Sequence, residues 1–328
     1  MRARVMNPTR TDRVARPADP VIPRVSVTGA SGFIGSALCL GLRQQGWRVR
    51  GLTRSDAAAE RLSGLGVEVV RGGLADGVAL ADWVAGADAV VHCAGAVRGA
   101  DYDDFARTNV NGTRRLLEAM AGLHLPLVAL SSLAAREPAL SDYARSKYDM
   151  ERLLEASGVP NGCLMLRPPA VYGPGDRELR PLFDAFARGI APLPGAPEAR
   201  VSLLHVDDLV AAIVAWLDAS DRPDGVYEIG DQQAGGYSWE EVVATAETLL
   251  QRRIRRIRLP RTALAGAARA NRRLARWFGY APMLTPGKLA ELRHDDWVCD
   301  NTPLQDRLDW QPQVTLAEGL ARTCGWGA

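Results

Sequence analysis

Short apolar runs alternate with helical patterns along the first half of this 328-residue chain, from Arg24 onward. Helical patterns stand at 31–45, 105–123 and 142–156. The apolar runs are 25–27, 47–54, 67–72, 87–95, 127–132 and 162–168. Continuous apolar strands joined by helices predict a parallel sheet buried on both faces. Their repetition predicts an α/β, Rossmann-type, doubly wound fold.

The pattern changes after Arg167, where Pro- and Gly-rich loops flank a short helix expected at 178–188. A helix expected at 207–219 resumes the earlier style. Small helices follow, with N-caps predicted at Ser238 (in a capping box with Glu241), Thr285, Thr302 and Thr315. We therefore expect a smaller, mostly helical C-terminal substrate lobe. The expected division is 1–23 as a disordered extension, 24–167 plus 202–225 as the dinucleotide-binding domain, and 168–201 plus 226–328 as the substrate lobe.

Composition excludes several classes of protein. The net charge of +2 is too small to indicate nucleic acid as the main partner. Five scattered cysteines without a CxxC pair, and four histidines without ligand spacing, predict a metal-free protein of the reducing cytoplasm. The N-terminal segment lacks the apolar core of a signal peptide, and no apolar run is free enough of charge to form a transmembrane helix.

Three glycines, Gly29, Gly32 and Gly35, follow the first predicted strand and open the first helix. Glycines there permit a tight turn, a close approach of the backbone to pyrophosphate and close helix–strand packing. The helix N-terminus adds free amides and a partial positive charge. This context predicts a cradle for a dinucleotide.

Tyr143 and Lys147 lie four residues apart on a predicted helix, so both project from one face. A neighbouring ammonium stabilises a phenolate, so we expect Lys147 to lower the pKa of Tyr143 toward the neutral range. Two serines, Ser131 and Ser132, lie at the end of the fifth predicted strand.

The motifs "TGASGFIG", "VHCAG", "NVNGT", "YARSK", "RPPAVYGPGD" and "HVDDL" occur in this order. With them, the chain from Val25 to about Leu320 resembles the extended short-chain dehydrogenase/reductase (NAD-dependent epimerase/dehydratase) family. Its motifs are most similar to those of 3β-hydroxysteroid dehydrogenase and dihydroflavonol reductase-like members. The resemblance implies catalytic roles for Ser132, Tyr143, Lys147 and Asn109, the last as part of a proton relay or as a structural brace. It implies that Ser132 hydrogen-bonds the substrate oxygen, with Ser131 as the alternative serine. It implies cofactor contacts from Gly29, Ser31, Gly32, Phe33, Ile34, Gly35, Arg54, Leu74, Asp76, Ala94, Gly95, Tyr143, Lys147 and Pro168.

Cofactor choice depends on the end of the second strand. NAD-preferring sites place an acid there, whereas this chain has Arg54, with Asp56 two residues later. An arginine suits a 2′-phosphate, so NADP is favoured over NAD. The acidic adenine contact usual in the family is replaced by Gly73, with Asp76 nearby.

The resemblance to 3β-hydroxysteroid dehydrogenase and dihydroflavonol reductase-like members implies an NAD(P)-dependent oxidoreductase that interconverts a hydroxyl and a carbonyl on a small, apolar substrate, with tyrosine as general acid/base. Ser132 is followed by Leu133 and Ala134, whereas dehydratases of the family have Asp-Glu at these positions. Ala170 stands where epimerases of the family have an asparagine that contacts the substrate diphosphate. A nucleotide-sugar epimerase with tightly held NAD is the alternative, and a non-catalytic structural or regulatory subunit is a second. The resemblance implies a homodimer.

Residues 251–276 hold ten arginines and no acid. We interpret this segment as a solvated face of the substrate lobe, from which an arginine such as Arg256 could clamp a diphosphate. Peripheral membrane contact through 251–280 is the alternative. Trp277, Phe278 and Tyr280 are expected to pack or to line the pocket. In "HVDDL", Asp207 or Asp208 is expected to cap the following helix, without a catalytic triad.

Overall fold

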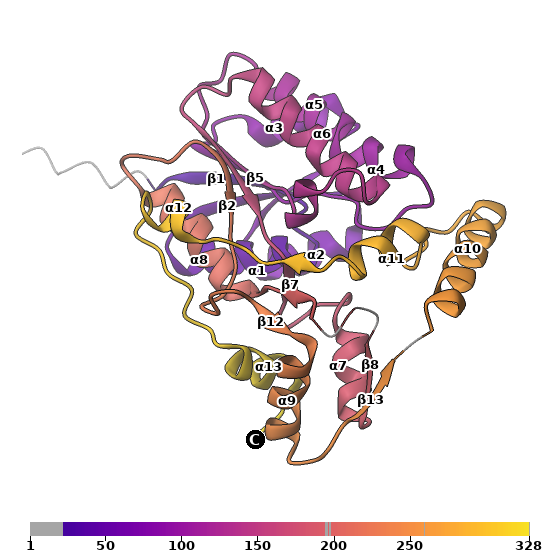
Figure 1. Cartoon of the computed structure of the whole chain (residues 1–328). Helices are drawn as coiled ribbons and strands as arrows, with labels where there is room; N and C mark the ends of the chain where they lie inside the picture. The colour runs from indigo at the N-terminus through magenta and orange to yellow at the C-terminus, as the bar shows by residue number, and fades with distance from the viewer. Residues whose placement is uncertain (1–21, 194–195, 197, 259, 328) are drawn as a thin grey trace, which may run out of the picture.

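The computed structural model describes residues 22–193, 196, 198–258 and 260–327 (Figure 1). The expected N-terminal extension therefore lies, apart from its last two residues, outside the described residues. The centre of the molecule is a seven-stranded parallel sheet in the order β11-β6-β5-β4-β1-β2-β3. Its strands are β1 (Arg24–Thr28), β2 (Arg48–Thr53), β3 (Glu68–Arg71), β4 (Ala89–His92), β5 (Leu127–Leu130), β6 (Cys163–Arg167) and β11 (Gly225–Glu228).

Helices cover both faces of this sheet, which confirms the doubly wound α/β fold (Figure 1). One face is covered by α1 (Phe33–Gln44), α2 (Asp56–Gly64) and α8 (Val206–Asp218). The other is covered by α3 (Gly77–Val84), α5 (Asn111–Met120) and α6 (Asp142–Ser157), with α4 (Tyr102–Asn109) packed against α6. The buried strands β4 and β5 consist of apolar residues with one histidine, because neither face meets water.

The single helix expected at 105–123 forms two helices, α4 and α5, which meet at Val110. The N-cap of α4 is Asp101, whose carboxylate accepts a hydrogen bond from the amide of Asp104. The last residue of α4, Asn109, is fully buried, and its side chain bonds to the loop after β4. The break therefore places a buried polar side chain beside the carboxyl ends of the strands.

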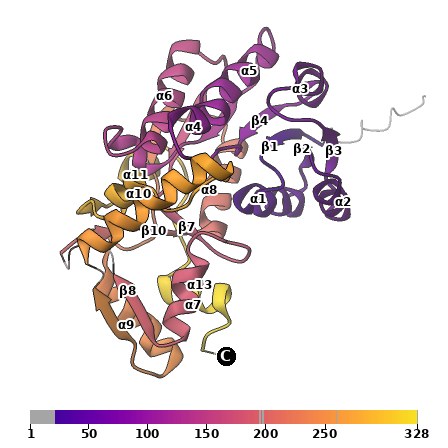
Figure 2. The ribbon, with the colours of Figure 1, turned by 90° about the vertical axis from the view of Figure 1, so that its right-hand side faces the viewer.

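A second, smaller lobe lies beside the carboxyl ends of the sheet strands (Figure 1, Figure 2). Its core contains apolar residues of α7 (Arg180–Ala187), α9 (Trp239–Leu250) and α13 (Leu316–Cys324). Its strands have two to four residues each and form three small sheets. They are β7 (Ala170–Tyr172), β8 (Ile190–Leu193), β9 (Arg200–Val201), β10 (Leu203–His205), β12 (Tyr237–Ser238), β13 (Arg255–Arg258) and β14 (Asp296–Trp297).

The remaining helices follow the predicted caps with one exception. Ser238 and Thr315 each form a capping box, and Thr285 caps α11 (Pro286–Leu292). Thr302, predicted as an N-cap, is instead the first residue of α12 (Thr302–Gln305), and Asn301 precedes it. Asn301 uses its side chain to bind Gly230 and Asp231, which fastens α12 to the chain after β11.

The expected domain boundary at residue 225 falls on the first residue of β11, so the central sheet continues to Glu228. Among the described residues, no helix is long and apolar enough to cross a bilayer. The longest one, α10 (Arg261–Phe278), is rich in arginine and projects from the edge of the molecule beside α11 (Figure 1).

Candidate active site

The turn between β1 and α1 has no room for a side chain at Gly29 or Gly35. A Cβ on Gly29 would lie 2.6 Å from the amide nitrogen of Ala94, and one on Gly35 would lie 2.1 Å from the carbonyl oxygen of Gly29. Gly29 also has φ +65°, which L side chains rarely adopt. Gly32 is the N-cap of α1 and supplies no side-chain bond, so the first amides of the helix stay available to a ligand.

This cradle fits the pyrophosphate of a dinucleotide, which is held by backbone amides and a helix N-terminus. The exposed residues Ser31 and Gly32 form its open side, and Phe33 and Ile34 follow in the first turn of α1. Ala94 and Gly95 lie opposite, after β4. A Cβ on Gly95 would lie 3.2 Å from the Lys147 Nζ, which places that ammonium at the same opening.

Tyr143 lies in the first turn of α6 with its ring edge-on to Phe105, at a centroid distance of 5.8 Å. Burial raises the pKa of the Tyr143 phenol to about 12, although a hydrogen bond with Ser132 acts in the opposite direction. Ser132 directly precedes the 3-10 turn Leu133–Arg136 (η1), whose amide at Ala134 it also caps. The hydroxyls of Tyr143 and Ser132 therefore lie within hydrogen-bonding distance of each other.

Lys147 lies one helical turn after Tyr143, and its side chain is 4% exposed. Its Nζ donates a hydrogen bond to the carbonyl oxygen of Leu130, at 2.7 Å. Burial lowers the pKa of Lys147 to about 8, against the opposing effect of the Glu151 carboxylate. The expected lowering of the Tyr143 pKa is wrong, since desolvation of the phenol raises the pKa by more than the hydrogen bond with Ser132 lowers it.

Ser131, the alternative serine, points away from Tyr143. Its hydroxyl donates to Oε1 of Glu151 at 2.5 Å, and the carboxylate is also bound by the guanidinium of Arg167 at 2.6 and 2.8 Å. Glu151 is 1% exposed, so these partners compensate a buried charge. The geometry gives Ser131 a structural role and leaves Ser132 beside the tyrosine.

Asn109 connects three segments of the site. Its Oδ1 accepts from the amide of Ala96 at 2.8 Å, and its Nδ2 donates to the carbonyl of Ala96 and to the hydroxyl of Ser146. Ser146 lies on α6 between Tyr143 and Lys147. These contacts are those of a brace between α4, the loop after β4, and α6.

Arg54 follows β2 and is exposed, and its aliphatic stem lies against Gly73, where a Cβ would be 2.9 Å from the arginine Cδ. Asp56 is ion-paired with Arg71 at the end of β3. Asp76 accepts from the amide of Ala79 as the N-cap of α3, so its carboxylate is engaged locally. The end of β2 thus presents a basic group.

Leu74 and Pro168 are the other two residues expected to contact the cofactor. A Cβ on Gly112 would lie 2.7 Å from the Leu74 side chain, which therefore packs against α5. Pro168 is buried after β6, and its carbonyl accepts a hydrogen bond from the amide of Leu133.

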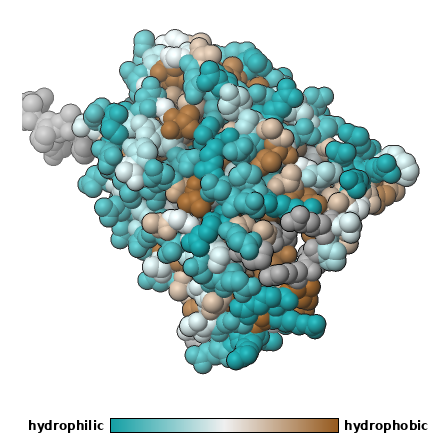
Figure 3. Space-filling view, viewed as in Figure 1, coloured by the Kyte–Doolittle hydropathy of each residue, from teal (hydrophilic) through white to brown (hydrophobic). Residues whose placement is uncertain are grey.

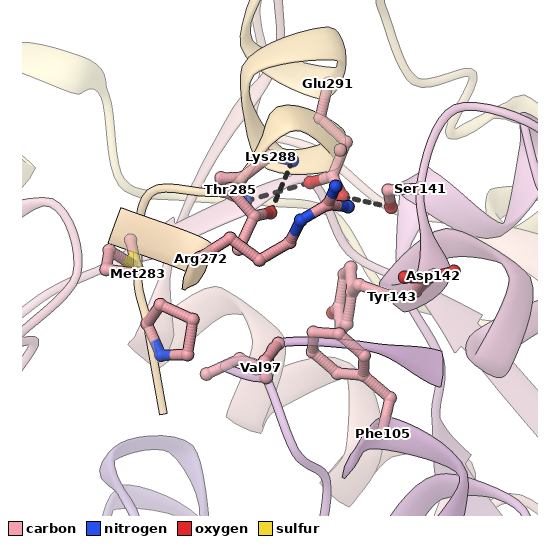
Figure 4. Close-up of a pocket in the computed structure, with 14 residues that line it drawn as sticks. Val97, Phe105, Ser141, Asp142, Tyr143, Arg272, Met283, Thr285, Lys288 and Glu291 are labelled. Carbon is pink, nitrogen blue, oxygen red and sulfur yellow. Dashed lines mark hydrogen bonds and ion pairs between the residues drawn. The ribbon is translucent and has the colours of Figure 1, made fainter. Parts of the chain in front are cut away.

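A cleft opens beside Tyr143 (Figure 4). Its lining residues are Val97, Gly99, Ala100, Phe105, Ser141, Asp142, Tyr143, Arg272, Pro282, Met283, Thr285, Gly287, Lys288 and Glu291. Lys288 forms an ion pair with Glu291 at 2.9 Å and lies 5.9 Å from the centre of the Tyr143 ring. The wall therefore combines apolar side chains with a cluster of charged ones.

Sequence reasoning missed this wall, which comes from α10, α11 and the loop between them. The one available signal was that Lys288 is, with Lys147, one of only two lysines in the chain. The residue expected to clamp a diphosphate, Arg256, instead forms ion pairs with Glu240 and Glu247 on α9. It is absent from the residues that line the cleft.

The "HVDDL" residues hold the fold together. His205 is the N-cap of α8, which corrects the expectation of an aspartate cap. The carboxylate of Asp208 accepts from the amides of Gln313 and Val314, both at 2.9 Å. Among the described residues, no group of three or more His, Cys, Asp or Glu side chains is placed to hold a metal ion.

Comparison with known proteins identifies a matching family and similar relatives. A model of the NAD dependent epimerase/dehydratase family matches residues 25–230. The chain is 34% identical over 302 residues to a ceramide reductase of Caulobacter vibrioides, covering 92% of this chain and 93% of the relative. It is 27% identical over 332 residues to a 3 beta-hydroxysteroid dehydrogenase/Delta 5-->4-isomerase of Mycobacterium tuberculosis, covering 90% and 88% of the two chains.

A solved UDP-glucuronic acid 4-epimerase of Bacillus cereus, in complex with UDP-glucuronic acid and NAD, superposes with a TM-score of 0.71. The match covers 91% of this chain and 97% of the epimerase at 21% identity, and so demonstrates the shared fold. The chain belongs to the NAD dependent epimerase/dehydratase family. It is an oxidoreductase enzyme, as the sequence predicted.

Proposed function

We propose that this enzyme interconverts a carbonyl and a hydroxyl on an amphiphilic, lipid-like substrate. The observation that carries the proposal is Tyr143, paired with Ser132 at the floor of a cleft whose wall is partly apolar. The ceramide reductase relative, which is similar over nearly its whole length, supports a lipid as the substrate.

When bound, the nicotinamide would supply or accept the hydride. Tyr143, which lines the cleft, then exchanges a proton with the substrate oxygen. Its pKa, raised to about 12 by burial, keeps it protonated at neutral pH, the form that can donate to a nascent alkoxide during reduction. Ser132 donates a second hydrogen bond to that oxygen and orients it.

The polar wall suits the head of an amphiphile. Lys288, Glu291 and Arg272 stand on one side of the cleft, and Phe105 and Val97 stand on the other (Figure 4). Charged groups beside the reacting carbon can bind hydroxyl or amide groups, while the apolar residues receive an alkyl chain. Ala170 adds no side-chain donor at the position where epimerases place an asparagine.

We infer that the cofactor is NADP. Arg54 follows β2 and Arg71 is the last residue of β3, and the acid that could repel a 2′-phosphate, Asp56, is neutralised by its ion pair with Arg71. An arginine binds a phosphate through charge-assisted hydrogen bonds. We further propose a homodimer in the cytoplasm, and the five free cysteines of the described chain support a reducing compartment.

The test is oxidation of NADPH by the purified enzyme with a long-chain 3-oxo amide as substrate. Tyr143→Phe should lower turnover by roughly 10²-fold or more and leave NADPH affinity within a few-fold, because only the proton donor is lost. Tyr148→Phe is the matched control, since Tyr148 lies on the same helix and is 38% exposed. Undiminished turnover by Tyr143→Phe would overturn the proposal.

A nucleotide-sugar epimerase is the second candidate, and one observation favours it. Arg272 and Lys288 give the cleft two cationic side chains that could hold a diphosphate, although Lys288 is paired with Glu291. Calorimetry with UDP and dTDP on the cofactor-loaded enzyme separates the candidates. Micromolar nucleotide binding that Arg272→Ala abolishes, without net NADPH consumption, would establish the epimerase.

A further inference from the structure

The outer surface of α10 carries an exposed apolar stripe. Trp277 is 82% exposed, Phe278 74% and Leu274 44%. Ala263, Ala267 and Ala270 are also exposed and continue the stripe with Leu274 and Trp277 at alternating spacings of three and four residues. The expectation that Trp277 and Phe278 pack or line the pocket is therefore wrong. Exposed aromatic residues at the end of an apolar stripe are typical of an interaction surface.

A basic stripe lies next to the apolar one. Arg269, Arg273 and Arg276 recur at the same spacing and are exposed, and their side chains form no ion pair or hydrogen bond with another described residue. The sequence contains no aspartate or glutamate from Thr248 to Ala290. The space-filling view shows hydrophilic and hydrophobic residues side by side on the projection that α10 forms (Figure 3).

The inner surface of α10 is separate from both stripes. Ala268 and Ala275 are fully or nearly fully buried, and Arg272 lines the active-site cleft. In Figure 2 the helix lies along the outside of the molecule, beside α11. The outer stripes are therefore free of the packing that holds the helix in place.

We propose that the outer surface of α10 docks the enzyme on an anionic membrane surface. An amphipathic helix binds such a surface by burying apolar side chains among the acyl chains while its arginines contact anionic headgroups. Trp277 and Phe278 would enter the interface, since aromatic rings favour that depth. The stretch from Thr248 to Ala290 contains arginines and no acidic residue, so its charge is complementary to an anionic surface. A neutral or basic partner surface would lack this complementarity.

The docking surface adjoins the cleft along the chain. Trp277 and Phe278 end α10, and Pro282 and Met283, which line the cleft, follow within five residues. A helix docked in this way would bring the cleft close to the membrane that holds an apolar substrate. Docking itself is measured without substrate or turnover, so its failure and the failure of the proposed function are distinguishable.

The test is flotation of the full-length protein with vesicles of phosphatidylcholine alone or of phosphatidylcholine with phosphatidylglycerol. The protein should bind only the anionic vesicles, and salt should release it. Reversing the basic stripe (Arg269→Glu, Arg273→Glu and Arg276→Glu) should weaken binding by roughly 100-fold or more, at about 1 kcal/mol for each arginine. The charge-matched control reverses Arg61, Arg114 and Arg115, exposed arginines on α2 and α5, and should bind more tightly than the stripe variant.

The apolar stripe has its own variants. Trp277→Ser with Phe278→Ser should abolish binding, whereas Val78→Ser, which removes an 84% exposed side chain on α3, should not. Tryptophan emission should shift to the blue on anionic vesicles, and Trp277→Phe should remove that shift while keeping most of the affinity. Thermal denaturation verifies that each variant folds.

Three results would overturn the proposal. The first is that the protein binds neither kind of vesicle, and the second is that the stripe variant and its charge-matched control lose vesicle affinity equally. The third is a blue shift of the emission that persists in Trp277→Phe. A change of the Trp277→Ser, Phe278→Ser variant from dimer to monomer, with no vesicle binding by the unmodified protein, would assign the surface to contact between two copies of the chain instead.

Discussion

Replacement of Lys147 by methionine should change how the stability of the enzyme depends on pH. Burial lowers the pKa of Lys147 from 10.5 to about 8. That difference corresponds to about 3 kcal/mol by which the buried ammonium destabilises the fold below pH 8. Between the two pKa values the unfolded chain binds a proton that the folded chain has released. The free energy of unfolding of the wild type therefore rises with pH across this window.

Methionine has a similar length and no titratable proton. The free energy of unfolding of Lys147→Met therefore lacks the rise with pH that Lys147 causes in the wild type. The unfolding free energy of the wild type minus that of Lys147→Met should increase by about 2–3 kcal/mol from about pH 7 to about pH 10. Loss of the bond to the Leu130 carbonyl shifts the difference by a constant and leaves its slope unchanged. Tyr143, whose pKa is raised to about 12, is present in both proteins, so its contribution cancels.

The assay is equilibrium urea unfolding of the cofactor-free proteins at several pH values, followed by circular dichroism. Lys147→Met should also be inactive, since the ammonium at the cofactor opening is gone. Parallel stability curves for the two proteins would refute the reasoning, because Lys147 would then titrate alike in the folded and unfolded chains. A difference that falls with pH would contradict the sign of the shift itself.

Four other substitutions test separate parts of the site. Arg54→Ala should weaken NADPH binding by about 1.5–3 kcal/mol and leave NADH binding nearly unchanged in titration calorimetry, because only the 2′-phosphate contact is lost; equal losses would contradict the NADP assignment. Ser132→Ala should lower kcat by roughly 10²-fold without a change in melting temperature. Ser131→Ala should lower the free energy of unfolding by about 1–3 kcal/mol and keep kcat, and the reverse result would exchange the roles of the two serines. Gly35→Ala should lower thermal stability and NADPH affinity together, because its Cβ would lie 2.1 Å from the Gly29 oxygen, and a variant that still binds NADPH normally would contradict the cradle.

The central sheet could be predicted because its signals are local. The central strands β4 and β5 are nearly continuous apolar runs, and the glycines and the Tyr143–Lys147 pair lie at fixed distances from predicted strands. The seventh strand, β11, was missed because its residues are only partly buried at the sheet edge and carry no apolar run. The short strands of the small lobe have two to four residues, too few for any periodicity to be read.

The wall of the cleft was beyond sequence reasoning for a different reason. Glu291 bonds to Ser141 from a position 150 residues later in the chain, and no local pattern encodes that contact. The pKa of Tyr143 was predicted in the wrong direction for a related reason. Helical spacing placed Lys147 on the same face, but burial of both groups depends on segments that are remote in sequence.

The position of α8 in the fold has a consequence for the newly made protein. Leu164 and Leu166 on β6 belong to the apolar layer that α8 covers, and α8 ends only at Asp218. At a synthesis rate of about 5–20 residues per second, this face of the sheet waits about 3–10 s between the emergence of β6 and that of α8. Ribosome-bound chains of intermediate length therefore expose an apolar sheet face that α8 buries in the complete enzyme. We expect these chains to bind chaperones during that interval.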